Sequence, residues 1–234
     1  MQRILGLIGG MSWESSAHYY RMINEQVRDA RGGMHSARIL LWSFDFAEIE
    51  ALQRAGDWVA ATQAMVDAAR RLESAGATAI VVCTNTMHRM AEAVQAAIAS
   101  PLLHIADPTA AAVKAAGIER IGLLGTAFTM EHDFYKGRLA GRHGLDVRVP
   151  GAEDRAAVHR IIYDELVRGQ ASAASRQIYR GVMQRMVDDG AQGIILGCTE
   201  IMLLVGAGDA SVPLFDTTAL HAQAAARHLL ESPV

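Results

Sequence analysis

Short apolar runs alternate along the chain with longer segments whose apolar residues recur at helical spacing. The runs are predicted to be strands, at residues 4–8, 38–42, 79–82, 120–124 and 193–196, with an edge-like strand at 147–150. Helices are predicted near residues 15–30, 57–74, 130–143, 154–167 and 172–188. Regular alternation of strands and helices predicts an α/β fold in which helices flank parallel sheets.

The two halves of the chain resemble each other. Residues 76–86 align without a gap on residues 190–200, at an offset of 114, and residues 6–8 align on 122–124 at an offset of 116. Both longer segments end in a polar cluster, which a chance match between two buried strands would not produce. We therefore predict two pseudo-symmetric lobes, each a small parallel sheet flanked by helices, with the active site in the cleft between them.

Lobe one is predicted to contain residues 1–100 and 215–234, and lobe two residues 101–214. Pro101 and Pro108 mark the crossover between the halves and Pro213 the return, because proline interrupts regular structure.

Composition narrows the function classes. The chain has 234 residues, a formal charge of −3 and 22 basic residues that are scattered, which argues against nucleic acid and anionic membranes as partners. No apolar stretch approaches the roughly 20 residues of a spanning helix. The only cysteines, Cys83 and Cys198, are too few for a disulfide framework. These features predict a soluble, cytoplasmic protein with reduced thiols.

Glycine and small polar residues follow four of the predicted strands, at residues 9–12, 83–86, 125–126 and 197–200. In parallel sheets, ligands bind beyond the carboxyl ends of the strands. Glycines there let backbone N–H groups approach a ligand, hydroxyl and amide groups add partners, and helix N-termini favour a carboxylate. This combination suits the carboxylate of an amino acid.

Two of these segments carry a family resemblance. Residues 81–88 (Val-Val-Cys-Thr-Asn-Thr-Met-His) and 195–201 (Ile-Leu-Gly-Cys-Thr-Glu-Ile) resemble the two signature motifs of the aspartate/glutamate racemase family. Residues 9–12 (Gly-Gly-Met-Ser) match the amino-terminal loop of that family, and Glu200 is more like its aspartate racemase branch. The resemblance extends over essentially the whole chain.

The resemblance implies a homodimeric enzyme that inverts the α-carbon of a small acidic amino acid. One group removes the α-proton and another delivers a proton to the opposite face, with no pyridoxal phosphate, other cofactor or metal. Independently, the histidines show no metal-ligand spacing, and residues 6–10 lack the G-x-G-x-x-G order of a dinucleotide site.

Cys198 is the leading catalytic candidate, but its counterpart departs from the family pattern. The family's first motif has cysteine directly before asparagine, whereas here Thr84 precedes Asn85 and Cys83 lies one residue earlier. The alignment of the halves pairs Thr84 with Cys198. Since neighbouring strand residues point to opposite faces, Cys83 and Thr84 both face the cleft only if a bulge intervenes. We favour Thr84, which predicts an enzyme biased in direction, because a hydroxyl is a much weaker acid than a thiol.

The family pattern also implies substrate contacts. The residues expected to hold the substrate are Met11, Ser12, Asn85, Thr86, Thr199 and Glu200. Two residues are expected near its distal carboxylate, Arg168 and Gln53, of which Gln53 is predicted to lie in a loop after the second strand. Structural alternatives stay open: Cys83 as a buried core residue, Arg168 as a solvated charge, His88 as a local cap and His104 as a structural histidine.

Two other functions also stay open. One is a single-cysteine decarboxylase or isomerase on the same scaffold, suggested by the unpaired Cys198. The other is a non-catalytic amino-acid-binding protein, suggested by Thr84.

Overall fold

The computed structural model describes residues 3–231, which divide into two compact units, 3–104 with 221–231, and 105–220. These bounds differ by a few residues from the predicted ones. The first unit extends to residue 104 because the strand β4 (Leu102–Leu103) pairs with β3 (Ala79–Val82). The second extends beyond 214 because β8 (Leu214–Asp216) pairs with β7 (Ile194–Gly197).

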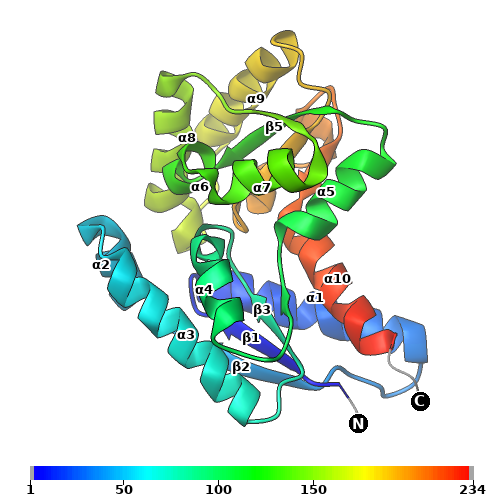
Figure 1. Cartoon of the computed structure of the whole chain (residues 1–234). Helices are drawn as coiled ribbons and strands as arrows, with labels where there is room; N and C mark the ends of the chain where they lie inside the picture. The colour runs from blue at the N-terminus through cyan, green and yellow to red at the C-terminus, as the bar shows by residue number, and fades with distance from the viewer. Residues whose placement is uncertain (1–2, 232–234) are drawn as a thin grey trace. The chain divides into compact units, whose positions relative to one another are not determined.

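The first unit is a four-stranded parallel sheet with helices on both faces (Figure 1). Its strand order is β2-β1-β3-β4, with β1 at Leu5–Gly9 and β2 at Ile39–Ser43. The helices are α1 (Trp13–Arg31), α2 (Phe46–Ala55), α3 (Trp58–Ser74), the 3-10 helix η1 (Thr86–Met90), α4 (Ala91–Ala96) and, from residue 221, α10 (Thr217–Leu230). Side chains of α1 and α10 pack on one face, and those of α2, α3, η1 and α4 on the other.

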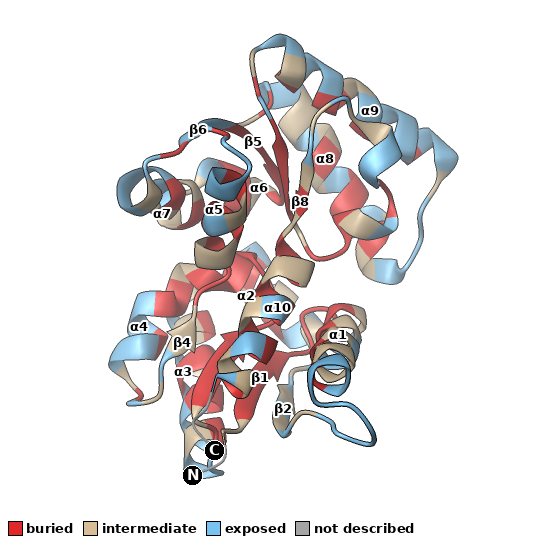
Figure 2. Cartoon of the chain, turned by 90° about the vertical axis from the view of Figure 1, so that its right-hand side faces the viewer, coloured by how far each residue is buried: buried red, intermediate tan, exposed pale blue. Residues whose placement is uncertain are grey.

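The second unit repeats this plan with the order β6-β5-β7-β8, in which β5 is Arg120–Gly125 and β6 is Asp146–Arg148. Its helices are α5 (Ala106–Ala115), α6 (Ala127–Glu131), α7 (Asp133–His143), α8 (Ala152–Asp164), η2 (Leu166–Arg168), α9 (Ala173–Asp188), η3 (Ile201–Leu203) and η4 (Ala207–Asp209). Side chains of α5 and α7 cover one face, and those of α8 and α9 the other. The central strands of both sheets are buried (Figure 2). No helix within residues 3–231 is long and apolar enough to cross a membrane.

Strand register confirms the alignment of the two halves. Gly6 pairs with Ile80 in the first sheet, and Gly122 pairs with Ile194 in the second, which reproduces the offsets of 116 and 114. The carbonyl oxygens of Pro101 and Pro213 accept equivalent hydrogen bonds, each of 2.9 Å, from the N–H groups of Ile80 and Ile194. The residues that follow β3 and β7 therefore occupy equivalent positions in the two units.

Several predicted elements need correction. Gln53 lies in the helix α2 rather than in a loop, because Asp45 caps the start of that helix by accepting a 3.0 Å hydrogen bond from the N–H of Ala47. The helix predicted at 130–143 is two helices that His132, in extended conformation, separates. Pro108 lies inside α5, in its first turn, where the missing N–H has no helical partner to lose.

Close packing at the carboxyl end of β7, in the second sheet, leads to a prediction about stability. An added Cβ at Gly197 would lie 2.7 Å from the carbonyl oxygen of Leu124, whereas one at Gly141, on the exposed side of α7, would meet nothing within 4 Å. Gly197→Ala is expected to lower the free energy of unfolding by about 1–3 kcal/mol through overpacking. Gly141→Ala is expected to raise it by roughly 0.5–1 kcal/mol, because alanine favours a helix. Urea unfolding followed by circular dichroism measures both, and equal effects would refute the packing argument.

Candidate active site

In the first unit, the loops after β1 and β3 emerge side by side because these strands are neighbours in a parallel sheet. Ser12 caps α1 by accepting a hydrogen bond of 3.3 Å from the N–H of Ser15. The hydroxyl of Ser15 in turn donates to the carbonyl of Cys83 at 3.2 Å. Gly10 has φ of 83° and its Cα lies against the backbone of Phe44, so a side chain has no room there. The first loop is thereby fixed against the second.

Cys83 and Thr84 occupy different surroundings. Cys83 is 1% exposed and packs with Val81 in the core under α1 and α10. Its N–H donates to the carbonyl of Ile8 at 2.9 Å, so the regular strand pairing continues through this residue. Burial raises the pKa of the Cys83 thiol. Thr84 is 9% exposed, and its carbonyl accepts a 2.7 Å hydrogen bond from Nδ1 of His88.

A cluster of buried rings supports the loop after β3. The ring centroid of His88 lies 4.6 Å from that of His104 and 5.7 Å from that of His221. Nε2 of His221 donates to the carbonyl of Leu103 at 2.7 Å, and its Nδ1 is hydrogen-bonded to the hydroxyl of Tyr19 at 2.9 Å. His88 and His104 thus have structural contacts. Sequence reasoning missed Tyr19 and His221, since 202 positions separate them and neither lies in a motif.

The other first-unit candidates are buried around the same loops. Met11 belongs to the core under α3, and Asn85 and Thr86 are 2% and 6% exposed. Gln53 is 5% exposed and its amide donates to Sδ of Met87 at 3.2 Å, which fixes α2 to η1. The first unit therefore brings Gln53, from α2, to the segment that holds Asn85 and Thr86.

In the second unit, the residues that follow β7 form a compact hydrogen-bonded group. Cys198 is half-buried, and its thiol donates to Oε2 of Glu200 at 3.0 Å. The hydroxyl of Thr199 donates to the same oxygen at 2.8 Å. Thr199 and Glu200 are 3% and 4% exposed. Burial, the negative charge of Glu200 and the hydrogen bond to it raise the pKa of Cys198, so the resting group is a thiol.

Arg168 lies at the end of η2, in the same unit as Cys198. It is exposed, and within residues 3–231 it forms no ion pair. Its guanidinium group is thus available to an anion.

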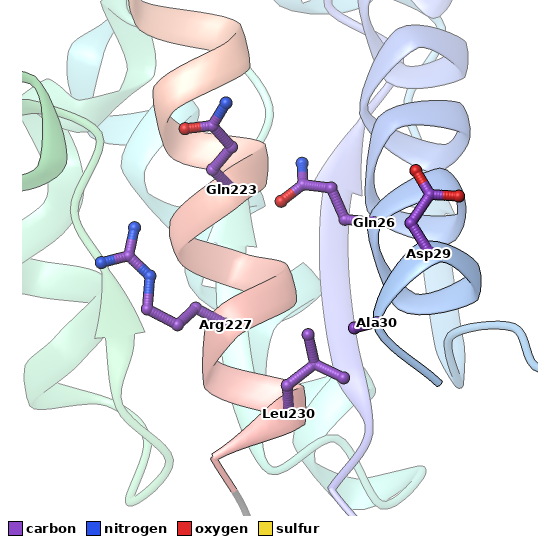
Figure 3. A pocket seen from close by; sticks show the side chains of 6 residues that line it. All are labelled: Gln26, Asp29, Ala30, Gln223, Arg227 and Leu230. Atoms are coloured by element: carbon purple, nitrogen blue, oxygen red, sulfur yellow. The ribbon is translucent and has the colours of Figure 1, made fainter. Parts of the chain in front are cut away.

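Two further features of the described residues are a surface hollow and the absence of a group of metal ligands, and neither involves the candidate residues. A surface hollow between α1 and α10 is lined by Gln26, Asp29, Ala30, Gln223, Arg227 and Leu230, and includes none of the candidate residues (Figure 3). Among the described residues, no group of three or more His, Cys, Asp or Glu side chains is placed to hold a metal ion.

Comparison with known proteins supports the motif resemblance. A sequence profile of the family described as Asp/Glu/Hydantoin racemase matches residues 8–225. The structure is similar to that of a candidate Asp/Glu racemase from Yersinia pestis, at 58% identity over 98% of this chain and 100% of that one, with a TM-score of 0.92. It is also similar to an aspartate racemase homologue from Pyrococcus horikoshii OT3, at 32% identity over 99% and 100% of the two chains, with a TM-score of 0.83.

A third structure, an aspartate racemase from Picrophilus torridus, shares the fold at 20% identity, over 99% of this chain and 96% of that one, with a TM-score of 0.76. The chain belongs to the Asp/Glu/hydantoin racemase family, whose members are isomerases. The resemblance predicted from the motifs is therefore confirmed, as is the α/β fold with two parallel sheets flanked by helices.

The two thiols are expected to differ in accessibility. In the native protein, iodoacetamide should modify Cys198 increasingly with rising pH, because the thiolate is the nucleophile. Cys83 should react only after unfolding, because its side chain is enclosed by core residues. Peptide mass spectrometry of native and urea-unfolded samples measures both reactions. Labelling of Cys83 at the rate of Cys198 in the native protein would contradict this placement.

Proposed function

We propose that this chain is a cofactor-independent racemase that inverts the α-carbon of aspartate or glutamate. The observation that carries the proposal is the equivalent placement of Thr84 and Cys198 after β3 and β7, in a member of a racemase family. The names of the two most similar structures described above, one an Asp/Glu racemase candidate and one an aspartate racemase homologue, support this substrate class.

In the proposed mechanism, Cys198 exchanges a proton with one face of the α-carbon, and Thr84 serves the opposite face. A threonine hydroxyl is too weak an acid to match a thiol, so Thr84 relays a proton between water and the substrate. Because the two enantiomers have equal free energies in water, kcat/KM must be the same in both directions. The chemical difference between the two groups therefore makes kcat and KM each differ between the two directions, while the ratio kcat/KM stays the same.

The proposed substrate contacts are the groups to which the family resemblance points. Backbone and side-chain groups of Met11, Ser12, Asn85, Thr86 and Thr199 hold the α-carboxylate and the amine. Arg168 pairs with the distal carboxylate, for which the planar guanidinium is well suited, and Gln53 hydrogen-bonds the same end. The homodimer and the cytoplasmic location that the sequence suggests stay predictions.

The activity itself is tested with Cys198→Ala. Incubation of L- and D-aspartate and L- and D-glutamate, followed by chiral chromatography, should show inversion by the parent and none by the variant, since no other group replaces the thiol. Circular dichroism should show that the variant is folded. Inversion by Cys198→Ala within about tenfold of the parent, equivalent to about 1.4 kcal/mol in the barrier, would remove Cys198 from the mechanism. Release of carbon dioxide in place of inversion would instead indicate a decarboxylase.

The role of Thr84 is tested with a matched pair of variants. Cys83→Ala should lose little activity, because the Cys83 side chain packs in the core. Thr84→Cys should supply a second thiol and bring the two kcat values, one for each enantiomer, closer together. If Cys83 were the second acid–base group, the outcomes would be reversed: Cys83→Ala would be nearly inactive and Thr84→Cys neutral or harmful. Initial rates with each enantiomer distinguish the two assignments.

A further inference from the structure

One edge of the first sheet is open. In the strand order β2-β1-β3-β4, β2 pairs only with β1, and no other strand within residues 3–231 pairs with its outer side. The N–H of Leu5 donates to the carbonyl of Arg38 at 3.0 Å, and the N–H of Phe44 donates to the carbonyl of Gly9 at 3.0 Å. Because backbone groups alternate in direction along a strand, three residues of β2 direct their N–H and C=O groups away from β1: Ile39, Leu41 and Ser43.

The strand β2 lacks the features that usually protect an edge. Natural edge strands are very short or carry charged residues or proline, which prevent pairing with another chain. The strand β2 has five residues, Ile-Leu-Leu-Trp-Ser, with no charge and no proline. Leu41, at its centre, is 48% exposed. An open and apolar edge of this kind indicates that another strand covers it.

The helix beside this edge exposes aromatic side chains. Trp13 and Tyr20, both in α1, are 67% and 54% exposed, and their spacing of seven residues places them on one side of the helix. Asn24 continues this side, and its Oδ1 accepts a 2.9 Å hydrogen bond from the N–H of Ala37, just before β2. The aromatic side of α1 therefore borders β2, which lies beside α1 at the edge of the sheet (Figure 2).

Leu41 lies on the same face of the sheet as these aromatic residues. It is in register with Leu7, which packs in the core under α1 and α10. Since an aromatic side chain has roughly 150–250 Å² of surface, the exposed parts of Trp13 and Tyr20 amount to roughly 200–300 Å². Exposed apolar surface of a few hundred Å² marks an interaction site. A stable interface buries about 800 Å² on each partner, so the aromatic residues supply about a third and the strand edge with its neighbours the rest.

We propose that this surface is the interface with a second copy of the chain, and that the two β2 strands pair antiparallel about Leu41. The family resemblance implies a homodimer but specifies no interface, and the open edge assigns one. In this register Leu41 faces Leu41 of the second copy, and Ile39 faces Ser43. All three residues direct their backbone groups outward, so each facing pair forms two hydrogen bonds. The two sheets then form one continuous sheet.

The charges at the two ends of β2 fit this arrangement. Arg38 precedes β2, is exposed and forms no ion pair within residues 3–231. Asp45 follows β2 and is also exposed. Antiparallel pairing about Leu41 brings the Arg38 end of one copy to the Asp45 end of the other. The surface is therefore complementary to itself, which a two-fold interface requires and which a strand from an unrelated protein would not explain.

The first test is the oligomeric state, measured by analytical ultracentrifugation. The parent is expected to have twice the mass of one chain. Leu41→Lys and Leu41→Glu, each alone, should raise the dissociation constant of the dimer by about 100-fold or more, because like charges then face each other across the two-fold axis. An equimolar mixture of the two variants should recover a dimer, because opposite charges then face each other. Val59→Lys is the matched control and should stay dimeric, since Val59 is 84% exposed but lies in α3, which covers the opposite face of the sheet.

A second test measures the register and does not depend on whether the charged variants fold. It uses Cys198→Ser protein, in which the buried Cys83 is the only native cysteine. Leu41→Cys should form a disulfide between copies on oxidation, because facing hydrogen-bonded residues have Cα atoms about 5.5 Å apart, within the reach of a disulfide. Ser43→Cys is also at an exposed position of β2, but it faces Ile39 rather than itself and should not cross-link. Electrophoresis without reductant measures both reactions.

A parent that is monomeric at the highest soluble concentration would overturn the inference. A parent-like dimer of Leu41→Lys, or cross-linking of Ser43→Cys in place of Leu41→Cys, would also overturn it. Neither test uses a substrate, so the proposed interface and the proposed racemase function fail separately.

Discussion

Parallel pairing of β1 with β3 and of β5 with β7 brings the carboxyl ends of neighbouring strands together in each unit. In the second unit the backbones of β5 and β7 approach closely: an added Cβ at Gly125 would lie 2.8 Å from the carbonyl oxygen of Gly197. Because the register is the same in both sheets, the turn after β3 and the turn after β7 begin at equivalent positions. Each candidate acid–base group is thus positioned by backbone pairing rather than by its own side-chain contacts.

The same position has different chemistry in the two units. Cys198 is a half-buried thiol next to a carboxylate, and each unit of pKa increase adds about 1.4 kcal/mol to the cost of forming its thiolate. The thiolate of Cys198 is therefore a strong base that forms rarely. Thr84 has no ionisable side chain, and His88 contacts its backbone carbonyl rather than its hydroxyl. Cys198 and Thr84 are therefore chemically unlike groups at equivalent positions of the two units.

Sequence patterns predicted much of this arrangement because the deciding features are local. Apolar runs, the polar residues that end them and the gapless alignment of residues 76–86 on 190–200 led to the sheets, the register and the placement of Cys83 in the core. The helix α2 was missed because it follows a strand closely and its start depends on one side-chain cap from Asp45. The contacts of Tyr19 with His221 and of Glu200 with Cys198 involve side-chain directions, which no spacing rule specifies.

The central claim, that two unlike groups serve the two faces of the α-carbon, is tested most directly by hydrogen exchange. L- and D-aspartate are incubated separately with the protein in D₂O, and the α-proton of the unreacted enantiomer is followed by NMR at early times. A hydroxyl and its water exchange their protons with solvent readily, whereas a half-buried thiol returns to the carbon the proton that it took. Deuterium is therefore expected to enter the unreacted pool of one enantiomer only, while every inverted molecule carries deuterium. Equal deuterium entry into both unreacted enantiomers would contradict the account.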